Sequence, residues 1–311
     1  MNRNPLRVCV IGTGHLGERH ARTYATLPGV TLTAVCDVDA SKARRVARQL
    51  GCGAVDDFRA LIGRVDAASV SVPTTLHYAL GRPLLEAGVH LLIEKPLTTT
   101  VSQAQALIRI AKRRGCLLQV GHIERFNAAI RAAMGRLRRP RFIEVHRLSP
   151  YPHRSTDVSV VMDVMIHDLD LLLALVRAPI TRINAVGVPV LSSSEDIANA
   201  RVEFASGCIA NLTASRISDE SIRRIRVFQA DSYLSIDYQT QTVELARKSA
   251  GSIRRVELPV NRRAPLQDEL ASFVRAIRLH RPPEVSGEDG RAAVALALRI
   301  ERAMRRVRTL R

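Results

Sequence analysis

The sequence predicts a two-domain α/β protein: a doubly wound parallel sheet first, then an α+β domain with a large, open, mostly antiparallel sheet. Three observations support this. The 311 residues exceed what one ordinary core accommodates. Short, continuously apolar segments alternate with amphipathic ones up to about residue 121. Longer segments that alternate apolar and polar residues follow. We therefore predict domains at residues 1–121 and 122–311.

The first domain alternates predicted strands and helices. A parallel strand covered on both faces is apolar along its whole length, and five such segments are present. They lie at 6–11, 30–36, 66–72, 89–93 and 117–120. Helices are predicted between them at 15–27, 40–50, 76–87 and 102–114. Gly51, Gly88 and Gly115 follow the last three helices, where glycine ends a helix at low cost.

The second domain changes pattern. Ile143 and Val145 share one face of a predicted strand, and Ala198, Ala200 and Val202 share one face of another. This alternation indicates a sheet with one face exposed to water. Strands are predicted at 141–148, 198–204, 207–213, 223–229, 232–237 and 242–246. Helices are predicted at 125–137, 163–176, 266–279 and 287–307.

The composition indicates a packed protein without a membrane span. Apolar residues make up 46% and charged residues 24%, near average globular usage. No segment approaches the ~20 uncharged apolar residues that a membrane helix needs. The first residues lead directly into a predicted strand with no room for a signal peptide, so we expect a cytoplasmic location. The five cysteines include no C-x-x-C pair, which predicts reduced core thiols and no metal site.

The formal net charge of +18 indicates an anionic partner. The basic residues are spread over predicted helix faces and are densest in the C-terminal run: Arg302, Arg305, Arg306, Arg308 and Arg311. Aromatic residues are only 4% and do not alternate with these charges, so no base-stacking platform is predicted. We expect a small anionic molecule as the partner, and no nucleic acid.

A glycine-rich segment follows the first predicted strand and opens the first helix. It reads Gly12-Thr13-Gly14-His15-Leu16-Gly17. In this context Gly12 allows a tight turn, Gly14 lets the backbone approach a pyrophosphate, and Gly17 allows close packing of helix and strand. Asp37 ends the next strand, 20 positions after Gly17, where a carboxylate can accept hydrogen bonds from both ribose hydroxyls. These residues predict a Rossmann domain.

The same segment favours NAD as the cofactor. The carboxylate of Asp37 would repel the 2′-phosphate of NADP. Arg44 and Arg45, on the following predicted helix, leave NADP open as the alternative.

A second motif, Glu94-Lys95-Pro96, directly follows the strand predicted at 89–93. Ligands of doubly wound sheets bind at this end of the strands. Lys95 is one of only four lysines in an arginine-rich chain, and a lysine can release its proton where an arginine cannot. This placement predicts a functional lysine, with a solvated loop lysine as the alternative.

A third motif lies in the apolar helix predicted at 163–176. Asp163 and His167 stand at i and i+4, which share one face of an α-helix. Asp168 and Asp170 follow. Burying a histidine and three carboxylates is costly unless they are paired or used, and histidine is the usual general base near neutral pH. We predict a catalytic role for this group.

Together these motifs resemble the Gfo/Idh/MocA family of oxidoreductases. Gly12 to His20 is similar to that family's G-x-G-x-x-G-x-x-H start, Glu94-Lys95-Pro96 to its E-K-P signature, and Asp163 to Asp170 to its D-x-x-x-H-x-x-D segment. The segments 120–127 and 154–168 resemble a narrower group, the bacterial dehydrogenases that oxidise C3 of UDP-N-acetylglucosamine at the start of 3-amino sugar synthesis for lipid A. Ala128 departs from the proline expected there.

The resemblance implies a reaction and a set of residues. NAD would lie along 12–17, Asp37 and Glu94-Lys95, with Val72, Pro73, Thr74 and His77 lining its nicotinamide side. His167 would take a hydroxyl proton as hydride leaves the same carbon, with Asp163 and Lys95 assisting; Lys95 and His167 can exchange these roles. Substrate contacts are expected from Lys95, His167, Arg125, Asn127 and Arg154, with an ordinary surface or capping role as the alternative for the last three. A homodimer or homotetramer is also implied.

Two alternatives to this reading stay open. One is a dehydrogenase of inositol or of a free sugar, and the other is an NAD-binding regulator without catalysis. The complete set of Lys95, Asp163 and His167 favours an enzyme over a regulator.

Overall fold

The chain divides into two compact units. The computed structural model describes residues 4–151, 158–249 and 251–309, with side chains up to residue 306. Met1–His122 and Leu266–Arg291 form the first unit, and Ile123–Pro265 and Ala292–Arg311 form the second. One domain boundary is predicted from the sequence, near residue 121. The return of 266–291 to the first unit means that the second predicted domain is not one continuous segment.

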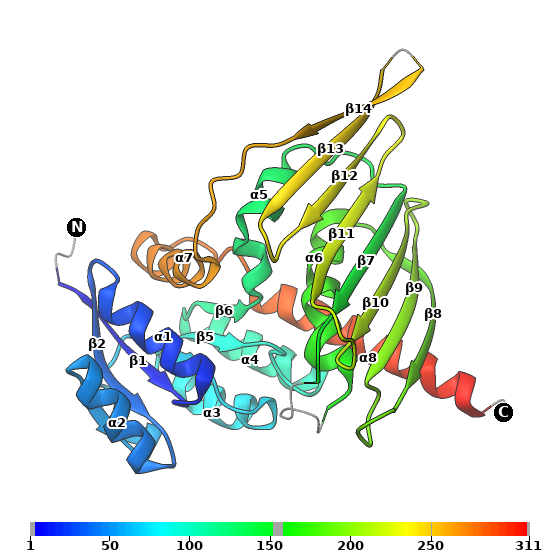
Figure 1. The fold of residues 1–311 in the computed structure, drawn as a ribbon. Helices are drawn as coiled ribbons and strands as arrows, with labels where there is room; N and C mark the ends of the chain where they lie inside the picture. Colours follow the sequence, from blue (N-terminus) through cyan, green and yellow to red (C-terminus); the bar gives the residue numbers. More distant parts are fainter. Residues whose placement is uncertain (1–3, 152–157, 250, 310–311) are drawn as a thin grey trace. The chain divides into compact units, whose positions relative to one another are not determined.

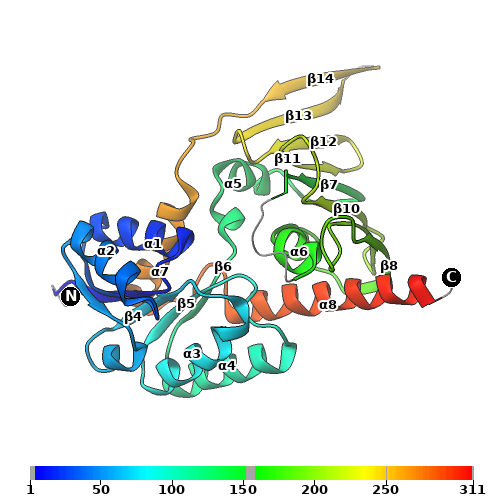
Figure 2. The same cartoon turned by 60° about the horizontal axis from the view of Figure 1, so that its bottom comes forward.

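A six-stranded parallel sheet forms the centre of the first unit. Its strand order, β3-β2-β1-β4-β5-β6, is that of a Rossmann fold and confirms the predicted doubly wound sheet. Helices α1 and α2 cover one face, and α3 and α4 cover the other (Figure 1 and Figure 2). The strands are β1 Leu6–Ile11, β2 Val30–Cys36, β3 Gly53–Val55, β4 Ala67–Val70, β5 His90–Glu94 and β6 Leu118–Gly121. The helices are α1 His15–Thr26, α2 Ala40–Leu50, α3 Thr74–Glu86 and α4 Val101–Arg114, with a 3₁₀ turn at Phe58–Leu61.

Residues 266–291 contact the rest of the first unit through polar side chains. These contacts could not be predicted from the sequence, because the partners are far apart along the chain. The Gln119 side chain of β6 donates to the carbonyl of Glu269 over 3.3 Å. The Arg278 guanidinium donates to the carbonyl of Gly29 over 2.5 Å. Two helices carry the segment: α7 Pro265–Leu279 and the beginning of α8 Gly287–Thr309.

An eight-stranded sheet forms most of the second unit, in the order β14-β13-β12-β11-β7-β10-β9-β8. Each described pair is antiparallel except β7 with β10, which confirms the predicted mostly antiparallel sheet. Helices α5 and α6 lie against one face (Figure 1). Residues alternate between buried and half-buried along β7, β9 and β12. The strands are β7 Phe142–Leu148, β8 Ile180–Val188, β9 Ile197–Phe204, β10 Ile209–Ser215, β11 Ile222–Phe228, β12 Ser232–Asp237, β13 Thr242–Ser249 and β14 Ser252–Glu257.

Two predicted helices of this unit differ from the structure. The helix predicted at 125–137 is a 3₁₀ turn, Ile123–Phe126, followed by the short α5, Ala128–Met134. The helix predicted at 163–176 begins as a π-helical turn, Val161–Met165, and becomes the α-helix α6 only at Ile166–Val176. Within the described residues, no helix is both long and apolar enough to span a membrane.

Candidate active site

The glycine-rich turn has the geometry that the sequence predicts. Gly12 has a φ of +90°, and a Cβ there would lie 2.3 Å from the carbonyl oxygen of Ser71. A Cβ on Gly17 would lie 1.8 Å from the carbonyl oxygen of Gly12, so helix α1 can approach β1 only with glycine at this position. Both residues are therefore fixed by steric contact.

Gly14 differs from the other two glycines. No described atom lies within 4 Å of the position that its Cβ would take. Gly14 is also the N-cap of α1, and no side chain caps this end. The N–H groups of the first turn of α1 are therefore available to an anion, and the space beside Gly14 admits one.

Asp37 lies at the end of β2, half-buried, with both carboxylate oxygens oriented. One oxygen accepts from the Thr13 N–H at 2.7 Å and the Thr13 hydroxyl at 2.8 Å, and the other accepts from the Asp39 N–H at 3.0 Å. Burial opposes ionisation, but these hydrogen bonds outweigh it and lower the pKa of Asp37. Arg45 is bound to Glu18 at 2.7 Å. An ionised carboxylate at the ribose position fits NAD and disfavours a 2′-phosphate.

His77 lies between two backbone carbonyls, and its side chain is completely buried. Its expected place beside the nicotinamide stays a prediction. Its ring nitrogens lie 2.8 Å from the carbonyl oxygen of Pro96 and 2.9 Å from that of Val72. Burial lowers the pKa of His77, against the effect of these carbonyls. His77 thus connects the segment after β4 to the segment after β5. Of the other residues predicted there, Val72 and Thr74 are half-buried and Pro73 is exposed.

The Glu94-Lys95 pair lies at the carboxyl end of β5, as predicted. Glu94 is buried, and its carboxylate accepts from the N–H of Lys95 at 3.2 Å. Lys95 is half-buried. This is the ligand-binding end of a doubly wound sheet.

The helix of the second unit that carries His167 begins with a π-helical turn. Asp163 lies in the π-helical turn and His167 in α6, both half-buried. A π-helical turn bonds residue i to i+5 and so rotates successive side chains differently from an α-helix. Such turns are frequent at functional sites. The regular helix predicted for this segment is therefore wrong in its first turn.

The two carboxylates that follow His167 are paired rather than exposed to substrate. Asp168 accepts from the Arg147 guanidinium at 2.8 and 3.2 Å and also from the Tyr238 hydroxyl. Asp170 accepts from Arg125 at 2.6 and 2.9 Å. The buried charges of α6 are thus neutralised by arginines of neighbouring elements.

The residues predicted to contact substrate have mixed outcomes. Asn127 is a buried N-cap: its side chain accepts from the Ala129 N–H at 3.0 Å and donates to the Tyr238 carbonyl at 2.8 Å. Its amide holds the start of α5, in agreement with the capping role, and the substrate contact stays a prediction. Arg125 is oriented by Asp170. Arg154 lies outside the described residues.

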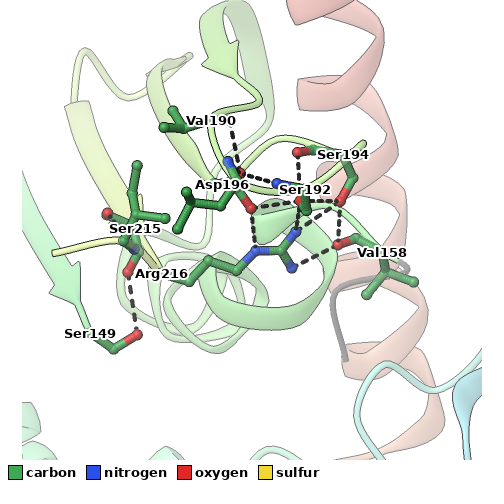
Figure 3. Close-up of polar contacts among 10 residues, drawn as sticks. Ser149, Val158, Val190, Ser192, Ser194, Asp196, Ser215 and Arg216 are labelled. Atoms are coloured by element: carbon green, nitrogen blue, oxygen red, sulfur yellow. Dashed lines mark hydrogen bonds and ion pairs between the residues drawn. The ribbon is translucent and has the colours of Figure 1, made fainter. Parts of the chain in front are cut away.

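A buried network holds the segment that leads into the His167 helix. Figure 3 shows Arg216 at its centre, completely buried. Its guanidinium donates to Asp196 at 2.9 Å and to the Val158 carbonyl at 2.9 Å. Ser192 and Ser194 also accept from it, at 2.9 and 2.8 Å. Arg216 is not predictable from the sequence, because nothing in the residues around it marks it as buried.

Comparison with known proteins agrees with these observations. Residues 6–122 match the model of an oxidoreductase family with an NAD-binding Rossmann fold, and residues 127–232 match the Gfo/Idh/MocA C-terminal domain. The chain belongs to the Gfo/Idh/MocA family. The predicted family, the oxidoreductase class and the NAD cofactor are confirmed.

Individual relatives of this family are similar over the whole chain. The UDP-N-acetylglucosamine 3-dehydrogenase of Acidithiobacillus ferrooxidans is 40% identical over 96% of this chain and 97% of its own length. A solved structure of that enzyme has a TM-score of 0.92 at 39% identity, covering 96% of this chain and 97% of that one. The myo-inositol 2-dehydrogenase of Thermotoga maritima is 25% identical over 98% of each chain.

Proposed function

We propose that this chain is an NAD-dependent dehydrogenase that oxidises the C3 hydroxyl of the N-acetylglucosamine moiety of UDP-N-acetylglucosamine to a ketone. The observation that carries this proposal is the 40% identity to a dehydrogenase of that substrate over nearly the full length of both chains. The net charge of +18 suits a substrate with a diphosphate. A cytoplasmic homo-oligomer fits the proposal.

The residues of the first unit fit the cofactor. The open space at Gly14, the uncapped start of α1 and the oriented carboxylate of Asp37 suit a pyrophosphate and an adenosine ribose. When bound, NAD accepts a hydride from the carbon that carries the reacting hydroxyl. Lys95 binds the oxygen of that hydroxyl as a hydrogen-bond donor.

The residues of the second unit supply the proton acceptor and the anion contact. His167 takes the hydroxyl proton, assisted by Asp163 four positions earlier, with Lys95 as the alternative base. Arg125 binds the substrate's anionic part, with one edge of its guanidinium fixed by Asp170.

The direct test is an assay of the purified chain with NAD and UDP-N-acetylglucosamine. A carbonyl trap is included because oxidation of a secondary alcohol by NAD is uphill near neutral pH. We expect NADH and one trapped 3-keto sugar nucleotide, with NMR assigning the carbon. Tight NAD binding without NADH formation would remove the UDP-sugar proposal. Turnover of inositol or a free sugar instead would establish the alternative substrate class.

The base assignment is tested in the same assay. His167→Ala should lower kcat by about 10² to 10⁴-fold, the usual contribution of a general base. The Kd for NAD should stay near that of the wild type, because the cofactor residues lie in the first unit. His146→Ala, at a half-exposed histidine on β7, is the control. Turnover that survives in His167→Ala would transfer the role of base to Lys95.

A further inference from the structure

Three titratable side chains from distant parts of the sequence meet inside the first unit. They are His20 of α1, Glu94 at the end of β5, and Glu269 of α7. One side-chain nitrogen or oxygen atom from each lies within 4.8 Å of the others. His20 and Glu269 are 0% exposed and Glu94 is 7% exposed. We call these three residues the buried triad.

The triad places two carboxylates where water does not reach. Nε2 of His20 lies 3.1 Å from Oε1 of Glu94. Nδ1 of His20 lies 3.3 Å from the Ser69 hydroxyl, which in turn lies 3.0 Å from the hydroxyl of Tyr24. Burying charged carboxylates is costly unless they are compensated. A core built for stability alone would use apolar groups here.

Glu94 is held from several sides. A Cβ on Gly121 would lie 2.8 Å from Cδ, Oε1 and Oε2 of Glu94, so the carboxylate rests on the bare backbone of β6. Oε1 faces His20, while Oε2 accepts from the N–H of Lys95. Burial opposes ionisation of Glu94, but His20 and Lys95 outweigh it and lower the pKa of the carboxyl. Glu94, whose carboxylate accepts from the N–H of Lys95, is therefore itself held in place by His20.

We propose that Glu269 and His20 are positioning residues for the dehydrogenase reaction, acting through Glu94 to set the position and charge environment of Lys95. The link rests on short distances: Nε2 of His20 lies 3.1 Å from Oε1 of Glu94, and one carboxylate oxygen of Glu269 lies within 4.8 Å of a side-chain atom of each of the other two residues. The helix that offers its N-terminus to the cofactor, α1, is joined in this way to the strand end that carries Lys95. This proposal rests on the proposed function of Lys95.

The first test needs no turnover. The chain has four lysines, Lys42, Lys95, Lys112 and Lys248, so competitive labelling with an acylating reagent and mass spectrometry can follow each amine separately. In Glu269→Gln and His20→Asn we expect the labelling rate of Lys95 to change by at least about three-fold. The other three lysines should label as in the wild type. An unchanged rate at Lys95 in both variants would overturn the proposal.

The second test separates positioning from simple stability. Glu269→Gln should lower kcat for the sugar nucleotide by about ten-fold or more, with the Kd for NAD nearly unchanged. Its melting temperature is measured alongside, because glutamine keeps the size of glutamate and changes only the charge of the side chain. Asp268→Asn, at a half-buried neighbour on the same helix, is the matched control. A fall in melting temperature with normal kcat would show a structural role and overturn the proposal.

Two further readouts complete the design. The double variant His20→Asn/Glu269→Gln should lose less than the product of the single losses if the two residues act as a unit. The pH dependence of kcat should also shift in the single variants. The titratable groups that face Glu94 are His20, Tyr24, His77, Lys95 and Glu269. If the losses of kcat multiplied in the double variant and the pH dependence of kcat did not shift, the proposal would be overturned. A stoichiometric divalent metal bound by the triad in the purified protein would also overturn it.

If the wild type does not oxidise UDP-N-acetylglucosamine, the proposed function fails while the labelling test still decides the role of the triad. If Glu269→Gln does not fold, His20→Asn carries the same test, because it removes the imidazole ring that contacts Glu94 and leaves both carboxylates in place.

Discussion

At the scale of single residues, we propose that Asp37 determines which dinucleotide the first unit accepts. Its carboxylate is pre-oriented by Thr13 and Asp39, and its lowered pKa keeps it ionised at neutral pH. A ribose with two hydroxyls can donate to it, whereas a 2′-phosphate meets an uncompensated negative charge. Rejection of a cofactor by like charge is an efficient source of specificity.

Asp37→Ser should therefore weaken NADH binding by about ten-fold, or roughly 1.4 kcal/mol, and strengthen NADPH binding relative to it. Fluorescence titration with both cofactors measures the ratio of the two Kd values. Asp39→Ser is the control, because Asp39 caps α2 and its loss affects the helix rather than the ribose site. A ratio that stays at the wild-type value in Asp37→Ser would contradict the assignment.

The site residues that sequence reasoning identified are those whose chemistry is local. Gly12, Gly17 and Asp37 follow from a strand, a turn and a helix within one short segment. Glu269 could not be found in this way, because its neighbour His20 is far away in sequence and only the fold joins them. Asn127 is a case in which the sequence left two roles open, and the structure shows one of them, the helix cap.

At the scale of elements, the start of the His167 helix depends on the β8–β9 connection through Arg216. The Asp196 carboxylate accepts from Arg216, the Ser192 hydroxyl and the N–H groups of residues 190–192. Burial opposes its ionisation, but these bonds outweigh burial and hold the pKa of Asp196 well below its ordinary range. Ser194 additionally donates to the Val158 carbonyl at 3.0 Å.

Arg216→Met should destabilise the second unit by about 3–5 kcal/mol, because it leaves a buried carboxylate without its cation. Arg224→Met is the matched control: Arg224 pairs with Asp237 at 3.5 Å on the sheet surface, and the loss of such a pair costs about 1 kcal/mol or less. Urea unfolding, read by circular dichroism, compares the two. If both variants lost the same free energy of unfolding, the burial of Arg216 would have no energetic consequence.

The stability of the Arg216–Asp196 network should also depend on pH. The folded-state pKa of Asp196 is lowered, so its stabilisation is complete above the unfolded-state pKa of about 3.9 and is lost as the pH falls below it. The stability difference between the wild type and Asp196→Asn should accordingly be constant near neutral pH and narrow in acid. If the difference in free energy of unfolding between the wild type and Asp196→Asn became larger in acid, this would contradict the lowered pKa of Asp196.

The elements that sequence patterning missed are those with weak or unusual patterns. β14 is exposed at every position, so it has no alternation to detect, and β3 has only three residues. β8 is an edge strand with a single buried residue, Ala185. The π-helical turn at 161–165 has the apolar composition of an α-helix and differs only in its hydrogen bonds. Strands and helices with a clear core face were predicted to within a few residues.

At the scale of the whole molecule, the net charge of +18 should act on the substrate before any specific contact does. Positive potential over a surface accelerates the encounter with an anion, and salt screens this effect over about 10 Å at 0.1 M ionic strength. UDP-N-acetylglucosamine carries its charge on the diphosphate, whereas inositol and free sugars are neutral. The two substrate classes should therefore respond differently to salt.

With NAD held at saturation, raising KCl from about 50 to 500 mM should lower kcat/KM for the sugar nucleotide by about three-fold or more, while kcat changes little. The matched measurement replaces KCl with sucrose at equal osmolarity, which leaves the electrostatics in place. His146→Ala provides an enzyme control with an intact charge pattern. If kcat/KM is unaffected by salt, the arginine-rich surface does not guide this substrate. The charge would then have another role, and Arg125 would be the remaining described candidate for recognising the diphosphate.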